Sequence, residues 1–145
     1  MRRIFLLMCI TLAIIGLAGC STGKDIDAAK ALGQNYYDAL KAKDFETAMS
    51  FYSPQFFEKT SRSDTLQALK GVNAKLGDLL SCDFTYLQVS RYGGTGGYFT
   101  RYNLNYDTTY SKGSAEETLT IIKSEDGSKM QILGFNIESL ALLTN

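Results

Sequence analysis

The sequence predicts an α+β domain in which N-terminal helices pack on a four-stranded antiparallel, curved sheet. Two observations lead to this fold class. Between residues 25 and 76, apolar side chains recur every three to four positions, which is the spacing of one face of a helix. From residue 84 onward the period changes to two, as in strands that bury one face. Helices in the first half and strands in the second are the element order of an α+β domain.

Three helices are expected in the first half. The helix over residues 25–43 carries one apolar face, which holds Ala29, Leu32, Tyr36 and Leu40. A second helix is expected to begin near Asp44, whose carboxylate suits an N-cap, and Pro54 either ends it or begins the turn after it. The third is expected over residues 63–76, with Gly77 as its C-cap.

Four strands are expected in the second half. In the first strand, Thr85, Leu87 and Val89 alternate with Phe84, Tyr86 and Gln88. After a glycine-rich turn, a long strand over residues 98–110 places on one face Tyr98, Thr100, Tyr102, Leu104, Tyr106, Thr108 and Tyr110. The third and fourth strands are expected over 117–123 and 130–140, joined by an Asp126-Gly127 turn. Gly134 indicates a bulge or bend in the fourth strand.

The first 19 residues have the layout of a secretory signal peptide. A basic start at Arg2 and Arg3 precedes an uncharged apolar stretch and then Leu17-Ala18-Gly19-Cys20. This tetrapeptide resembles the bacterial lipobox, which implies cleavage before Cys20 and acylation of its thiol. Because two acyl chains already hold a protein on a membrane, the bilayer is the first expected partner.

The resemblance also implies a cellular location. We expect residues 20–24 to be a lipidated cysteine with a short tether, which reaches at most about 16–18 Å when extended. Residues 25–145 then form a single domain close to the membrane. Ser21 after the cysteine is similar to the pattern of proteins sent to the outer membrane of Gram-negative bacteria, where the domain would face the periplasm.

The order of elements resembles the cystatin-like, cone-shaped fold of the nuclear transport factor and ketosteroid isomerase superfamily. The similarity covers residues 25–140 and rests on the segments 43–48, 106–110, 116–121, 125–127 and 133–137. Small secreted bacterial domains of unknown function are the narrower match. The fold hosts enzymes, binding modules and scaffolds, so it does not determine function.

Little in the sequence indicates catalysis. The chain has no His, which excludes Ser-His-Asp and Cys-His triads and His-based metal sites. Three acidic pairs are interpreted as structural: Asp25/Asp27, Glu116/Glu117 and Glu125/Asp126. The glycine run 93–97 lies between strands and predicts a hairpin loop rather than a phosphate cradle. We therefore expect no catalytic residue, metal or cofactor, and the lack of a Lys/Arg run argues against nucleic acid.

The nine tyrosines are the most unusual feature of the composition. They are interpreted either as core or as the lining of an open cone. In the second case Tyr36, Tyr102 and Tyr106 would bind a small apolar or aromatic ligand, since such folds bind ligands at the mouth of the cone. An isomerase-like site would also need a carboxylate on that face, whereas Asp107 is expected on the opposite face and Asp83 at a strand edge.

Three functions follow from these observations. The first is a membrane-anchored lipoprotein whose non-enzymatic domain binds a ligand or an envelope protein. The second is a small enzyme with a Tyr/Asp pocket. The third is a structural or assembly factor that forms a homodimer through its sheet. Cys82, expected to be the single free thiol of the exported chain, is interpreted as a buried core residue, with an intermolecular disulfide or a reactive thiol as the alternatives.

Overall fold

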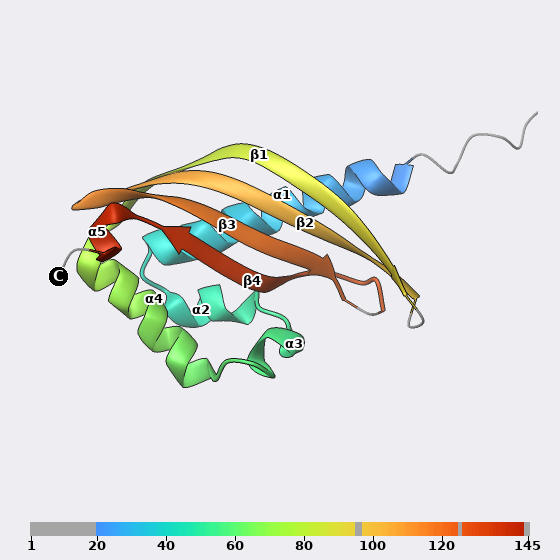
Figure 1. The fold of residues 1–145 in the computed structure, drawn as a ribbon, viewed down its shortest axis with the longest axis horizontal. Coiled ribbons are helices and arrows are strands. Elements are labelled where there is room, and N and C mark those ends of the chain that lie inside the picture. The colour runs from blue at the N-terminus through green and yellow to red at the C-terminus, as the bar shows by residue number, and fades with distance from the viewer. Residues whose placement is uncertain (1–19, 95–96, 125, 144–145) are drawn as a thin grey trace, which may run out of the picture.

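The computed structural model describes residues 20–94, 97–124 and 126–143. Its elements in chain order are α1 (Cys20–Lys41), α2 (Phe45–Ser50), α3 (Pro54–Phe57), α4 (Arg62–Leu76), β1 (Leu79–Gly94), β2 (Gly97–Tyr110), β3 (Gly113–Lys123), β4 (Met130–Glu138) and α5 (Leu140–Leu143). The predicted α+β class is confirmed, because helices precede a four-stranded antiparallel sheet of order β1-β2-β3-β4. The curved sheet arches over α1 (Figure 1).

Helix α1 differs from the prediction at both ends. It begins at Cys20 rather than at residue 25 and ends at Lys41 rather than at residue 43. The residues expected as a tether are therefore helical. Lys43 takes a left-handed backbone conformation with φ 59°, which helices do not continue through. Asp44 caps α2 as predicted, since its carboxylate accepts a hydrogen bond from the Thr47 amide at 3.0 Å.

The segment after α2 contains a short helix that the periodicity did not predict. Pro54 is the first residue of α3, where its missing N–H costs nothing. Helix α4 begins one residue earlier than expected and ends at Leu76. Gly77 has φ 82° and acts as the predicted C-cap, because a side chain at this φ would be strained.

Strand β1 is longer than predicted and contains an irregularity. The register shifts between Phe84 and Tyr86, so Phe84 pairs with Tyr106 and Tyr86 pairs with Asn105. The expected alternation is therefore wrong at one point: Phe84 lies on the same sheet face as Leu87, and Tyr86 lies on the other. A bulge inserts one extra residue and changes which face the preceding residues occupy.

The C-terminal strands follow the prediction with shifted ends. Strand β3 begins at Gly113 rather than at residue 117, and β4 ends at Glu138, after which Leu140 begins α5. The bulge predicted at Gly134 is confirmed, since Gly134 pairs with Thr120 while Ile132 pairs with Ile121. The chain between α2 and α3 covers part of the β4 edge, where Ile132 exchanges two 2.8 Å backbone hydrogen bonds with Phe51 and Ser53.

The core lies between α1 and the concave, inner face of the sheet. From α1 it takes Ala29, Tyr36 and Tyr37, and from the three strands β2, β3 and β4 it takes fully buried Leu104, Leu119, Ile121 and Ile132. The predicted alternation of β2 is confirmed from Tyr102 to Tyr110, where every second residue is buried. The same alternation places Arg101, Asn103 and Asn105 on the outer face.

Candidate functional site

A buried carboxylate lies at the centre of the core. Glu117 of β3 is 1% exposed, and its two oxygens accept three hydroxyl hydrogen bonds. The Tyr37 hydroxyl of α1 donates to Oε2 at 3.0 Å, while Thr108 and Tyr110 of β2 donate to Oε1 at 2.9 and 2.6 Å. We refer to Glu117, Tyr37, Thr108 and Tyr110 as the Glu117 cluster. It joins α1 to the adjacent strands β2 and β3, which lie about 70–80 residues further along the chain.

The alternation of β3 explains why Glu117 points inward. Ala115, Glu117, Leu119 and Ile121 occupy every second position, and all of them are buried. The interpretation of Glu116 and Glu117 as a pair that cannot converge is confirmed, because Glu116 is exposed. Glu117, the carboxylate on the tyrosine face, was not among the predicted site residues. The signal was present within the predicted strand 117–123, where Glu117 shares its alternation with Leu119 and Ile121.

Burial dominates the electrostatics of the cluster. Loss of solvent raises the pKa of Glu117 above its ordinary value of 4.5, although the three donated hydrogen bonds act in the opposite direction. Burial raises the pKa values of Tyr37 and Tyr110 even more strongly, and the nearby Glu117 carboxylate adds to this. Both tyrosines therefore remain donors. With both carboxylate oxygens occupied inside the core, the arrangement is suited to holding α1 against the sheet.

The three tyrosines predicted to bind a ligand are all buried in the core. Tyr36 is 0% exposed, Tyr102 2% and Tyr106 4%. The Tyr36 hydroxyl lies 3.0 Å from that of Tyr52, and the Tyr102 hydroxyl donates to Asp25 at 3.5 Å. The Tyr106 ring end packs against α1 at Gly33, where an added methyl group would lie 3.2 Å from Cζ.

The structure does not bring these three hydroxyls together. The Tyr36 hydroxyl meets Tyr52, while those of Tyr102 and Tyr106 meet α1 at Asp25 and at Gly33. The clefts beside Cys82, Phe135 and α5 are lined by other residues. This arrangement favours the core interpretation of the tyrosines. Asp107 is exposed on the outer face, as expected.

Cys82 is half-buried rather than fully buried. It faces inward on β1 opposite Thr108, beside a surface cleft of 230 Å³ that Tyr37 and Lys41 also line. Burial, with a smaller contribution from the Glu117 carboxylate, raises the pKa of the thiol to about 12. A thiol with such a pKa is a poor nucleophile at neutral pH.

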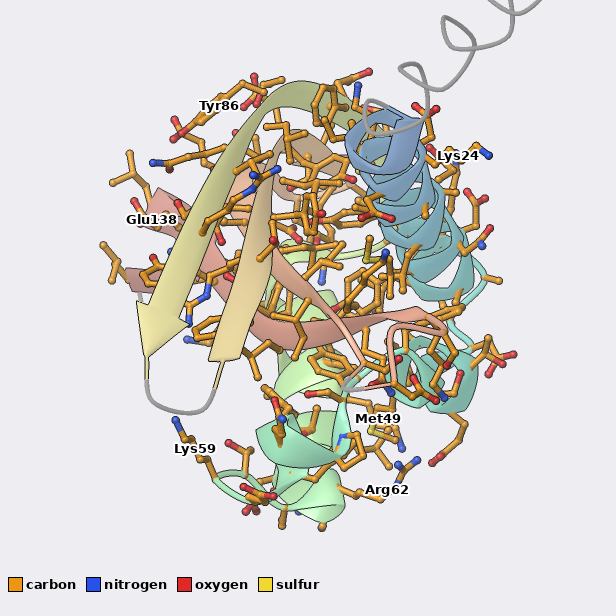
Figure 2. The ribbon with its side chains drawn as sticks, turned by 90° about the vertical axis from the view of Figure 1, so that its right-hand side faces the viewer. Lys24, Met49, Lys59, Arg62, Tyr86 and Glu138 are labelled. Carbon is orange, nitrogen blue, oxygen red and sulfur yellow. The ribbon has the colours of Figure 1, made fainter. Side chains whose placement is uncertain are left out.

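Most of the exposed apolar side chains lie on strand β1, on both of its faces. In the described part of the chain the exposed large apolar side chains are Leu80, Phe84, Tyr86, Val89, Tyr92, Phe99, Leu140 and Leu143. Five of them lie on β1, which is an edge strand whose one strand neighbour in the described sheet is β2. Figure 2 shows Tyr86, 60% exposed, on the side of the sheet away from α1. We define Leu80, Phe84, Tyr86 and Val89 as the β1 edge surface.

Comparisons with family models, curated proteins and solved structures found no match. No described helix has the length and apolar character needed to cross a membrane. Among the residues that the structure describes, no group of three or more Cys, Asp or Glu side chains is placed to hold a metal ion. The proposal for function therefore rests on the sequence motif at Cys20 and on the geometry described above.

Proposed function

We propose that this protein is an exported lipoprotein, anchored by acyl chains on Cys20, whose domain binds a partner protein of the cell envelope along the β1 edge surface. The lipobox-like Leu17-Ala18-Gly19-Cys20 supports the anchor. In a Gram-negative organism Ser21 favours the outer membrane, with the domain in the periplasm. Because α1 begins at Cys20, the proposed lipid site belongs to the first turn of a helix that packs in the domain.

The concentration of exposed apolar side chains on β1 carries the partner-binding proposal. An edge strand presents backbone donors and acceptors that an added strand can use, and apolar side chains beside them increase the affinity. The register of β1 with β2 is regular from Tyr86 to Gly94, after the bulge. A partner strand can therefore pair along this regular stretch, where Tyr86 is 60% and Val89 38% exposed.

The anchor is tested by Cys20→Ser. We expect this variant to lose acyl labelling and to accumulate as the uncleaved precursor, because both steps need the thiol. Metabolic labelling with a fatty acid analogue and the electrophoretic mobility of the protein measure the two effects. Normal cleavage with retained lipid would contradict the lipoprotein assignment.

The partner surface is tested by photo-cross-linking in intact cells. A photoreactive phenylalanine analogue replaces Tyr86, and the matched control places it at Lys70 on the exposed side of α4. We expect a discrete adduct from position 86, absent from position 70, that is lost when Val89→Lys is added. Adducts of equal yield from both positions, or none from position 86, would contradict the proposal. An adduct with the mass of two copies identifies the partner as the same chain.

A further inference from the structure

Two aromatic rings and an arginine form an exposed cluster near the turn between β1 and β2. The rings of Tyr92 and Phe99 stack with centroids 5.1 Å apart and an interplanar angle of 16°. The Arg101 guanidinium carbon lies 4.9 Å from the Tyr92 ring centroid and 5.9 Å from that of Phe99. Tyr92 is 42% and Phe99 49% exposed. We call these three residues the hairpin cluster.

The hairpin cluster lies at the same end of the molecule as Cys20. Contacts along α1 show that the helix and β2 run in the same direction: Asp25 bonds with Tyr102, Gly33 packs against Tyr106, and Leu40 lines a cleft with Tyr110. The start of α1 therefore lies beside the start of β2. Figure 1 shows the first turn of α1 and the adjoining ends of β1 and β2 at the right-hand end of the domain.

Cys20 and the hairpin cluster also extend to similar distances toward this end of the domain. From Asp25 back to Cys20, a helix rises about 7.5 Å. From Tyr102 back to Phe99, a strand extends about 10 Å. Because the side chains of Asp25 and Tyr102 are in contact, the two lengths can be measured from the same position along the domain. Their difference of about 2–3 Å is smaller than the roughly 5–10 Å to which amphipathic segments sink into the boundary between headgroups and acyl chains.

We propose that the hairpin cluster is a second membrane contact, which inserts Tyr92 and Phe99 into the lipid interface beside the acylated Cys20. This inference rests on the proposed lipid anchor. With both contacts made, the domain has a fixed orientation in which the adjoining ends of β1 and β2 face the bilayer. The middle of β1 then remains accessible to a partner.

The chemistry of the cluster fits a lipid surface. Amphipathic aromatic rings concentrate at membrane interfaces, where one part of the ring is apolar and the other polar. Arginine carries an apolar stem with a charged end that binds phosphate in a bidentate geometry. The Arg101 guanidinium lies against both rings, so a lipid phosphate bound to it would hold Tyr92 and Phe99 at the interface.

The absence of tryptophan from the chain makes a direct test feasible. The full-length lipoprotein carrying Phe99→Trp is reconstituted into vesicles of phosphatidylethanolamine and phosphatidylglycerol with brominated acyl chains. Leu143→Trp is the matched control, because Leu143 is 80% exposed and α5 packs beside the C-terminal end of α4, where Lys75 bonds with the Leu142 carbonyl. Tyr92→Trp is a second probe in case one substitution disturbs folding.

We expect the fluorescence of Trp at position 99 or 92 to shift to the blue and to be quenched at least twofold by the brominated chains. Trp at position 143 should show neither effect. Protein that floats with the vesicles but is not quenched at 99 or 92 would overturn the second contact and leave the anchor intact. Protein that does not float at all would overturn both. Equal quenching at 143 would overturn the proposed orientation and therefore the second contact.

Discussion

The two faces of β2 carry aromatic side chains in opposite settings. On the inner face, Tyr102, Tyr106 and Tyr110 are at most 6% exposed and pack against α1 and the core. On the outer face, Phe99 is 49% exposed and stacks on Tyr92. The inner rings are in contact with other parts of the same chain. The outer rings leave about half of their surface to water or to another molecule.

This difference shows why a high tyrosine content does not by itself indicate a ligand pocket. The inner tyrosines have a structural explanation, since the hydroxyls of Tyr37 and Tyr110 donate to Glu117 and that of Tyr36 lies against Tyr52. Buried polar groups that hydrogen-bond to one another specify one arrangement of helix on sheet. The outer aromatic rings are not buried in the core in this way, so they are the better candidates for intermolecular contact.

Removing the Glu117 carboxylate should produce the largest loss of stability. In Glu117→Leu, the hydroxyls of Tyr37 and Tyr110 lose their acceptor inside the core, at about 1–3 kcal/mol for each unsatisfied group. The Thr108 hydroxyl keeps the Ala115 carbonyl as an acceptor at 3.0 Å. Part of this loss is offset by the apolar side chain, so we expect a decrease of about 3–5 kcal/mol in the free energy of unfolding. Urea unfolding measures it. The control Glu116→Leu, on the exposed face of the same strand, should change stability by less than about 0.5 kcal/mol, and equal losses in the two variants would contradict the cluster.

Gly33→Ala should test the close contact between α1 and the inner face of the sheet. The added methyl group would meet the Tyr106 hydroxyl, and overpacking of this kind costs about 1–3 kcal/mol. Gly71→Ala in α4 is the matched control, because no atom lies within 4 Å of the added carbon. This variant should be more stable than the parent by about 0.5–1 kcal/mol. If thermal unfolding shows that both variants are stabilised, α1 does not pack on Tyr106 as described.

Two Tyr→Phe variants should show that the stability contribution of an inner tyrosine hydroxyl depends on whether it donates to Glu117. Tyr110→Phe removes the 2.6 Å hydrogen bond to Glu117 and should cost about 1–2 kcal/mol. Tyr106→Phe removes a hydroxyl that packs at Gly33, and it should cost less than about 1 kcal/mol. Chemical denaturation of the two proteins under identical conditions gives the difference. A larger cost for Tyr106→Phe would mean that its hydroxyl has the more important partner.

The pH dependence of stability should identify Glu117 as a buried titrating group. Because burial raises its pKa in the folded protein above 4.5, the folded state holds a proton that the unfolded chain releases. The resulting stabilisation is fully present below pH 4.5 and is lost as the pH rises through the folded pKa. In Glu117→Gln this loss should be absent, so the stability of the variant relative to the parent should increase with pH. Urea midpoints between pH 4 and pH 8 test this, and a constant difference would mean that Glu117 does not titrate in this range.

Periodicity predicted the fold class and most of its elements, because alternation and helical spacing record which face is buried. It predicted the inner stripe of β2. The residue types at Asp44, Gly77 and Gly134 predicted the cap of α2, the end of α4 and the bulge in β4. Periodicity failed at Phe84, because a bulge changes the face within a strand without changing the local pattern. It also did not predict α3 and α5, since four residues are too few to show a helical period.

The Glu117 cluster could not be fully predicted for a different reason. A glutamate in a strand is usually exposed, and its burial depends on donors that come from α1 and β2. Those contacts depend on the packing of helix on sheet, which spacing within one segment does not determine. The hairpin cluster likewise needs the register that brings Tyr92 opposite Phe99.

The central claim is that the inner tyrosines are packing and the outer aromatic residues make the intermolecular contacts. Oxidative footprinting of the individual tyrosines by mass spectrometry tests it most directly, with the protein in the cell membranes that the proposed anchor implies and after extraction into detergent. We predict that Tyr86 and Tyr92 are protected in the membranes and become reactive after extraction. Tyr36, Tyr102 and Tyr106 should remain unreactive in both states. Inner tyrosines that become reactive on extraction, while Tyr86 and Tyr92 do not change, would contradict the account and indicate a ligand bound inside the domain.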